Sequence, residues 1–252
     1  MQVTAIRMMP AKLSIIMADN EYSLAPLALL RLQSWLSPTF PIGTYSYSHG
    51  LEWAVEAGDV HDRTSLVAWL DADLCYGSGR NEAIFFAETW HCTVNRDFSR
   101  LIEIAELAAA LRATSELALE SSQPASACLT TLRRVWPDHL LDSLERTLHK
   151  RRISPTLAVV LATRAARSGI PLQLALPAFL QSYSANWVTA GVRLIPLGQT
   201  DGQLAIADLE NSVLAASARA NNADMTDLGS AAWMIDLASM AHETQYTRLF
   251  RS

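Results

Sequence analysis

Histidine, cysteine and glutamate side chains at two places in the sequence could bind a transition metal. Glu88 lies one helical turn before the adjacent pair His91 and Cys92, and His49 precedes Glu52 by three positions. Adjacent residues on a helix point in directions about 100° apart, so His91 and Cys92 cannot readily share one ion in an unstrained helix. His49 and Glu52 could share a helix face, and a transient metal contact there is the alternative. We predict no resident metal site.

The motifs of nucleotide chemistry and of common hydrolytic chemistry are missing. A Walker A loop needs a lysine directly after a glycine-rich turn, because that side chain reaches the β- and γ-phosphates. Neither Lys12 nor Lys150 follows such a turn, and the sequence contains no Gly-x-Ser-x-Gly elbow, His-Glu-x-x-His helix or Gly-x-Gly-x-x-Gly fingerprint. We therefore predict a protein that is not an enzyme, with no catalytic residues and no cofactor.

The least helix-like stretch of the chain is residues 37–52, with the sequence SPTFPIGTYSYSHGLE. Pro38 and Pro41 fix their own φ and disfavour the α region for the residue before each of them, while Gly43 can adopt a positive φ. From position 44 onward, helical spacing predicts a helix over 44–57. The stretch is thus expected to form a rigid turn that leads into a helix.

Two later segments have compositions that suit turns or interfaces. Residues 193–203 read RLIPLGQTDGQ, and residues 240–250 read MAHETQYTRLF. Tyrosine, phenylalanine and arginine dominate interface hot spots, so the segment at 240–250 fits one that becomes ordered on a partner. A segment that folds back on the core of its own chain is an equally good alternative on physical grounds.

Together these segments resemble the signatures of the UreF family of urease accessory proteins. Residues 37–52 are similar to the family's N-terminal signature, roughly Phe/Leu-Pro-x-Gly-small-aromatic-x-x-Ser-x-Gly/Ala-Leu-Glu. Residues 193–203 resemble its Pro-Leu-Gly-Gln connector, and residues 240–250 resemble its C-terminal His-Glu and Arg-Leu-aromatic signature. All three occur in the family's order, and the resemblance covers about residues 27–252.

The resemblance implies a cytoplasmic scaffold rather than an enzyme. UreF-like proteins are helical, dimerise, and bridge UreD (called UreH in some bacteria) to the GTPase UreG while the nickel centre of apo-urease is assembled. Direct activation of UreG, through an arginine acting in trans on GTP, and free-standing nickel carriage are the alternatives. The residues that match the signatures would bind partners: Pro41, Gly43, Tyr45, Ser48, Gly50, Glu52, His242, Glu243, Tyr246 and Arg248.

Composition predicts an all-α fold. The chain has 252 residues, of which 50% are hydrophobic, and alanine and leucine supply 74 positions against 11 valines and 12 isoleucines. We predict a single-domain bundle of about ten helices over residues 26–239, followed by a partner-binding segment over 240–252. Residues 1–25 are expected to form a flexible arm, and internal methionines leave open a true start within it.

Turn residues divide the chain into its predicted helices. Asp62 and Asp138 are natural N-caps, whereas Pro124 and the pair Asp201-Gly202 are expected to lie between helices. The predicted helices span 26–36, 44–57, 63–77, 82–94, 97–121, 126–135, 138–150, 156–168, 171–191, 203–221 and 227–239.

Charge and cysteine content argue against several classes of partner and location. A net charge of −5 without a long basic run argues against nucleic acid, which needs clustered lysine and arginine. Three scattered cysteines, without a secretory leader, fit free thiols in a reducing cytoplasm. Residues 168–192 are uncharged but contain Pro171, Pro177 and several polar side chains, so we expect a buried central helix and no membrane contact.

Overall fold

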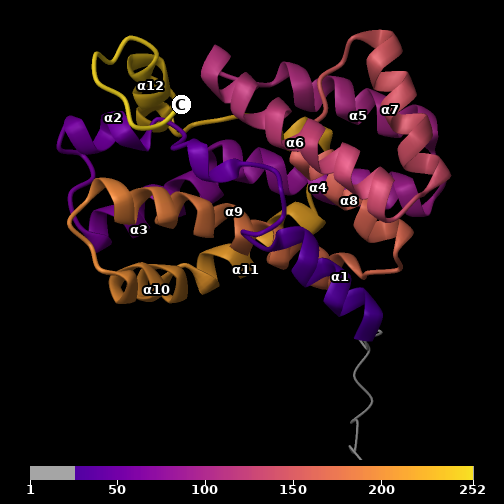
Figure 1. The fold of residues 1–252 in the computed structure, drawn as a ribbon, viewed down its shortest axis with the longest axis horizontal. Helices are drawn as coiled ribbons and strands as arrows, with labels where there is room; N and C mark the ends of the chain where they lie inside the picture. The colour runs from indigo at the N-terminus through magenta and orange to yellow at the C-terminus, as the bar shows by residue number, and fades with distance from the viewer. Residues whose placement is uncertain (1–25, 252) are drawn as a thin grey trace, which may run out of the picture.

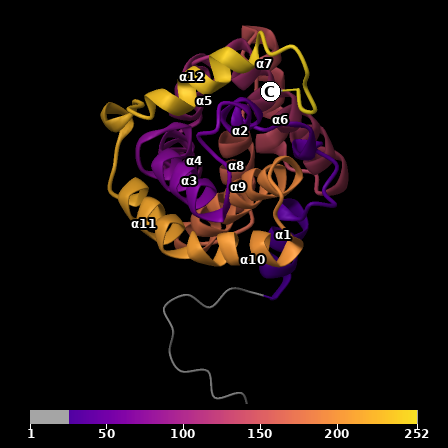
Figure 2. The same cartoon turned by 90° about the vertical axis from the view of Figure 1, so that its left-hand side faces the viewer.

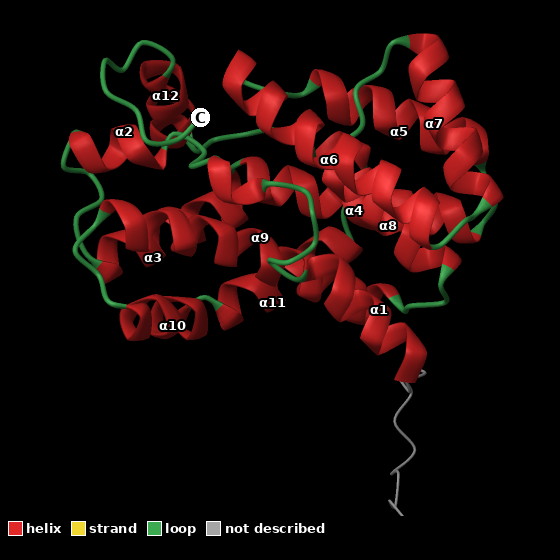
Figure 3. Cartoon of the chain, viewed as in Figure 1, coloured by secondary structure: helices red, strands yellow, loops and turns green. Residues whose placement is uncertain are grey.

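The computed structural model describes residues 26–251, which form helices joined by loops (Figures 1 and 3). This part of the chain contains no strand, which confirms the predicted all-α domain. The predicted N-terminal arm lies outside the described residues. The α-helices are α1 Pro26–Leu36, α2 Leu51–Glu56, α3 Arg63–Tyr76, α4 Ser78–Val94, α5 Phe98–Ala110, α6 Ser115–Val135, α7 His139–Arg151, α8 Leu157–Arg167, α9 Leu172–Leu194, α10 Gln199–Asp208, α11 Glu210–Asn221 and α12 Trp233–His242. Two short 3-10 helices are Thr44–Ser46 and Met225–Asp227.

Helices α4 and α9 form the centre of the fold. Helix α4 packs against α3, α5, α8, α9 and α11, and most of its side chains are buried. Phe86 of α4 stacks on Phe179 of α9, with ring centroids 4.9 Å apart. Helix α9 is the central helix that the sequence predicts for 171–191, and it also contacts α1, α2, α3, α8, α10 and α11. Among the described residues, no helix combines the length and apolar character needed to cross a membrane.

Buried side chains form two hydrophobic clusters. The larger cluster draws mainly on α1, α4, α5, α6, α7, α8, α9 and α11. The smaller cluster draws on α2, α3, α9, α10 and α12, and it includes Phe250 near the chain end. Figures 1 and 2 show α2, α12 and the C-terminus together at one corner of the molecule. The C-terminal segment is therefore part of the smaller cluster.

Side-chain caps place several helix starts where the sequence predicts them. The Asp62 carboxylate accepts a hydrogen bond from the Ser65 amide at 2.7 Å, and the Asp62 amide donates to the Ser65 hydroxyl at 3.0 Å. The Asp138 carboxylate accepts from the Leu140 amide at 2.8 Å. Both predicted caps are confirmed.

The predicted helix over 44–57 is wrong. Only the 3-10 turn Thr44–Ser46 and the short α2 are helical there. His49 and Gly50 have φ values of 56° and 75°, in the left-handed region, so a right-handed helix cannot continue through them. The break turns α2 away from the 3-10 turn.

Two further predicted boundaries are wrong because short-range caps start the helices at other residues. Pro124 lies inside α6, and the break comes earlier, where the Thr114 hydroxyl accepts a hydrogen bond from the Leu117 amide at 3.0 Å. Asp201 and Gly202 lie inside α10, because the Asp201 carboxylate accepts from the Gly198 amide at 3.0 Å and closes the helix start. The predicted helix over 203–221 is in fact α10 and α11.

Candidate partner-binding site

The proline-rich turn, residues 37–50, ends in a close backbone contact with α12. A Cβ atom on Gly50 would lie 2.6 Å from the Ser239 amide nitrogen and 2.9 Å from the Ala238 carbonyl carbon. Real Cβ contacts are longer than this, and the positive φ of Gly50 also disfavours a side chain. Glycine is therefore required where α12 crosses the end of the turn.

The three segments singled out in the sequence meet in space. The Arg193 guanidinium donates to the Tyr45 carbonyl oxygen at 2.9 Å and lies over the Phe250 ring, 4.3 Å from its centroid. The Arg251 amide donates to the Ser46 carbonyl oxygen at 2.9 Å. Residues far apart in the sequence thus form one continuous site.

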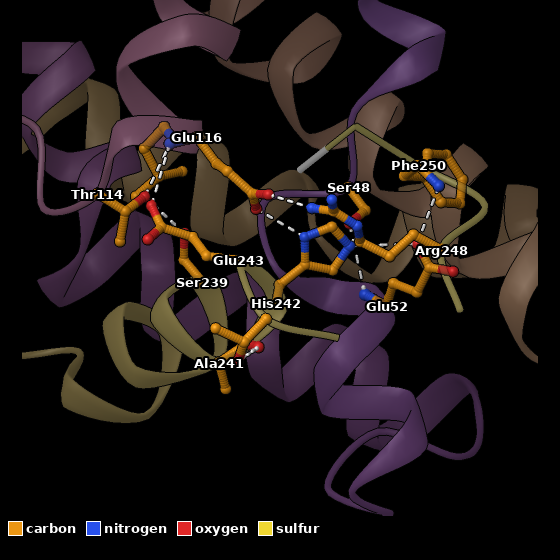
Figure 4. Close-up of polar contacts among 12 residues, drawn as sticks. Ser48, Glu52, Thr114, Glu116, Ser239, Ala241, His242, Glu243, Arg248 and Phe250 are labelled. Carbon is orange, nitrogen blue, oxygen red and sulfur yellow. Dashed lines mark hydrogen bonds and ion pairs between the residues drawn. The ribbon is translucent and has the colours of Figure 1, made fainter. Parts of the chain in front are cut away.

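Glu52 of α2 holds the backbone of the chain end (Figure 4). Its Oε1 accepts from the Leu249 amide at 2.6 Å, and its Oε2 accepts from the Phe250 amide at 2.9 Å. The Phe250 side chain is buried in the smaller cluster. Because two backbone donors converge on one buried carboxylate, Glu52 fixes the course of the C-terminal segment.

A second carboxylate, Glu116 of α6, holds the His242 and Arg248 side chains at the end of the chain (Figure 4). Its Oε1 accepts from the Arg248 guanidinium at 2.6 Å, and its Oε2 lies 2.6 Å from Nδ1 of His242. The other ring nitrogen, Nε2 of His242, lies 3.3 Å from Oε2 of Glu52. The His242 ring is completely buried, so it joins α2 and α6 through two carboxylates.

The N-terminus of α6 makes further polar contacts with the end of α12. The Thr114 and Ser239 hydroxyl oxygens are 2.8 Å apart. The Glu243 carboxylate accepts from the Ser115 hydroxyl at 2.6 Å and from the Ser115 amide at 3.0 Å. These bonds, the Ser115 hydroxyl above all, lower the pKa of Glu243 below its ordinary value.

The predicted partner-binding residues divide into an internal and an external set. Ser48, Gly50, Glu52 and His242 are buried, and Gly43 is half-buried. Pro41, Tyr45, Glu243, Tyr246 and Arg248 are exposed. The described C-terminal segment folds back on the core, which is the second of the two alternatives drawn from its sequence. A role of either set in partner binding stays a prediction.

Helix α12 also carries an apolar surface that the sequence prediction did not identify. Its outer face exposes Trp233, Met234, Leu237 and Met240, each between 47% and 69% exposed. We call these four residues the α12 stripe. The spacing of positions 233, 237 and 240 is the available sequence signal, since it places three large apolar side chains on one helix face.

The proline-rich turn forms one wall of a cleft of about 1080 Å³. Phe40, Ile42 and Phe179 supply part of its apolar lining, and Tyr183 lies at a polar region. The Tyr183 hydroxyl donates to the buried Asp73 carboxylate at 2.8 Å. Burial raises the pKa of both groups, and the Asp73 charge raises that of Tyr183 further.

In the described part of the chain, His49 and Glu52 do not share a metal site. Within residues 26–251, no three His, Cys, Asp or Glu side chains are placed to hold an ion. His49 pairs with Glu120 of α6, whereas Glu52 faces His242. Cys92 is buried, which raises its thiol pKa to about 12, and the three cysteines are free thiols.

Comparison with known proteins assigns the family. A family model described as UreF matches residues 60–210, more than half of the chain. The chain belongs to the UreF family. The UreF model does not extend over the proline-rich turn or the C-terminal segment.

Full-length UreF relatives cover most of the chain. It is 46% identical over 225 residues to the urease accessory protein UreF of Rhodopseudomonas palustris strain TIE-1, covering 89% of this chain and 92% of that protein. It is 45% identical to the UreF of Bradyrhizobium diazoefficiens, with the same coverage of both chains. For the UreF of Granulibacter bethesdensis the values are 44% identity, 89% of this chain and 94% of that protein.

Proposed function

We propose that this chain is a non-enzymatic accessory protein of urease maturation that bridges UreD and the GTPase UreG. Two lines of support come together. The three relatives described above are named urease accessory proteins. The observation that carries the proposal is the meeting of the proline-rich turn, Arg193 and the C-terminal segment beside the α12 stripe.

The chemistry of this corner suits protein docking. Large apolar side chains exposed on one helix face are favourable to cover, and exposed tyrosine and arginine are common hot-spot residues. Tyr45 is 70% exposed and Tyr246 is fully exposed. The Glu52 and Glu116 contacts fix the C-terminal segment to α2 and α6, so the surface is pre-organised for binding. In this proposal UreD covers the α12 stripe and the exposed side of the C-terminal segment.

The proposal extends to assembly and location. The chain acts as a cytoplasmic homodimer within a complex with UreD, UreG and apo-urease, and it contributes to nickel insertion through these partners. Helix α1 supports self-association, because it exposes Leu27, Leu29 and Leu30 at 46% to 63%.

A matched pair of leucines tests the UreD surface. Leu237 and Leu214 are each the fifth residue of a helix, α12 and α11 respectively, and they are 56% and 57% exposed. Replacing either leucine by aspartate changes charge and helix propensity equally. We expect Leu237→Asp to weaken UreD binding at least about tenfold, roughly 1.4 kcal/mol, and Leu214→Asp to leave it unchanged. Calorimetric titration of UreD into each folded variant measures the difference.

Other results would favour other functions. Equal UreD affinity of the two variants contradicts the proposed surface. A rise in UreG turnover that one Arg→Ala substitution abolishes would support direct activation of the GTPase. Tight stoichiometric nickel binding by the isolated chain would support a carrier.

A further inference from the structure

The buried contacts of His242 determine how many protons its ring must carry. Nδ1 faces an oxygen of Glu116 at 2.6 Å, and Nε2 faces an oxygen of Glu52 at 3.3 Å. Both carboxylates also accept hydrogen bonds from other donors of the C-terminal segment. Glu52 already accepts from two backbone amides, and Glu116 already accepts from Arg248.

An ionised carboxylate can only accept hydrogen bonds, so each ring nitrogen has to donate one. A neutral imidazole has one N–H and would turn its remaining lone pair towards a carboxylate oxygen. The imidazolium form has two N–H groups and satisfies both sides. It also balances the local charge, because Glu52 and Glu116 then face the two cations His242 and Arg248.

We propose that His242 is a protonation-controlled latch for the C-terminal segment. As an imidazolium it ties residues 242–251 to α2 and α6, and loss of its ring proton releases them. The latch is a property of the isolated chain. Its consequence for UreD binding, which is to present or withdraw the proposed UreD surface, rests on the proposed function.

The charged groups around the ring set the direction of the pH dependence. Glu52 faces it from α2 and Glu116 from α6, while Arg248 donates to the other oxygen of the Glu116 carboxylate. The neighbouring acids are occupied elsewhere, Glu243 with Ser115 and Glu56 with Gln245. Loss of the ring proton at rising pH leaves two buried carboxylates facing one cation, which is unfavourable.

Nuclear magnetic resonance of the isolated, isotope-labelled chain tests the latch directly. Ring nitrogen shifts report whether His242 carries both protons, and hydrogen exchange reports the protection factors of the Leu249 and Phe250 amides that donate to Glu52. We expect a doubly protonated ring while the segment is docked. On raising the pH, the two protection factors should fall at least tenfold as the ring loses its proton, while those of α9 amides stay constant. A neutral His242 ring in the docked state would overturn the latch. So would protection factors of Leu249 and Phe250 that stay constant while the ring loses its proton.

A matched histidine pair provides the control. His242→Gln can donate to only one of the two carboxylates, whereas His149→Gln changes an exposed ring in the last turn of α7. We expect His242→Gln to lower the Leu249 and Phe250 protection factors at least tenfold. The fall in these protection factors with rising pH, expected for the wild type, should be absent in this variant. His149→Gln should match the wild type. If His242→Gln does not fold, the wild-type pH profile alone decides.

Binding measurements separate the latch from the proposed function. Protection factors that follow ring titration, without any UreD binding by the docked form, would sustain the latch and reject the proposed UreD surface. The opposite outcome is a chain that binds UreD although its Leu249 and Phe250 protection factors do not change as the His242 ring titrates. That outcome would reject the latch and support the proposed function.

Discussion

At the scale of single residues, Asp73 shows how a buried acid can organise two helices. Helix α4 has Gly77 at its N-cap position, which has no side chain to accept from the free amides. The Asp73 carboxylate on α3 takes this role by accepting from the Gly79 amide and the Ser78 hydroxyl, each at 3.0 Å. Its bond from Tyr183 connects the same point to α9.

Two substitutions of Asp73 should separate the stabilisation from its hydrogen bonds from the destabilisation caused by burying its charge. Asp73→Ala removes the acceptor of three donors, of which the Gly79 amide is buried, and we expect it to lower the free energy of unfolding by about 3 kcal/mol. Asp73→Asn can accept from Gly79 and Tyr183 while donating to Ser78, so we expect a change within about 1 kcal/mol at neutral pH. Urea denaturation measures both changes. Equal losses in the two variants would mean that the negative charge itself is stabilising.

The raised pKa of Asp73 makes the free energy of unfolding depend on pH in a definite direction. Burial raises the pKa of Asp73 above its ordinary value of 3.8, so above that pH the folded chain binds more protons at this site than the unfolded chain. The contribution of Asp73 to the free energy of unfolding therefore falls as the pH rises from 3.8 through the raised folded-state pKa. Asp73→Asn lacks this contribution. Its stability relative to the wild type should increase with pH over that interval.

At the scale of secondary structure elements, the seating of α12 on α2 depends on Gly50. Gly50 and Gly43 share nearly the same backbone angle, with φ of 75° and 73°, but only Gly50 faces a neighbouring backbone. A Cβ on Gly43 would meet nothing within 4 Å. The two glycines therefore separate backbone strain from helix packing.

Alanine substitution of each glycine gives a matched experiment. Gly43→Ala should cost about 1 kcal/mol, the strain of a left-handed conformation. Gly50→Ala adds a clash with rigid backbone at Ser239, so we expect a loss of about 3 kcal/mol or more together with displacement of α12. Urea denaturation gives the free energies, and hydrogen exchange of α12 amides reports its displacement. A Gly50→Ala variant no less stable than Gly43→Ala would contradict the close contact.

The sequence locates the important segments better than it predicts their conformation. Prolines and glycines correctly mark the turn before α2, because their backbone limits are local. They do not reveal that His49 has a positive φ of 56°, which ends the predicted helix. Thr114 illustrates the same limit, since its hydroxyl caps α6 although Pro124 offers the more obvious break.

The site is harder to predict because its contacts are distant in sequence. His242 pairs with Glu116, 126 positions away, and with Glu52, 190 positions away. Charge pairs at such separations follow from the packing of α2, α6 and α12, which no local pattern contains. Resemblance to the UreF signatures selected Glu52 and His242, whereas Glu116 lies outside the three signature segments at 37–52, 193–203 and 240–250.

At the scale of the whole molecule, the two hydrophobic clusters have unequal dependence on the chain end. The larger cluster contains no residue beyond Ala220 among its buried members. The smaller cluster relies on Ile235 and Ala238 of α12 and on Phe250. Loss of the C-terminus should therefore disturb one corner of the protein and leave the rest intact.

Deletion of residues 240–252 tests this division. The truncated chain loses His242, the cation between Glu52 and Glu116, and Phe250, whose ring covers the smaller cluster under Arg193. Loss of the His242 and Phe250 contacts should weaken the packing of α12 on α2, so we expect a stability loss of about 3 to 5 kcal/mol. The circular dichroism signal should fall by no more than the contribution of α12. The proposed UreD surface predicts that UreD binding is lost as well, because the deletion removes the exposed side of the segment and loosens α12. A collapse of the whole helical signal would instead mean that the larger cluster cannot form without the smaller one, and that the chain end helps to build the fold as well as the docking surface.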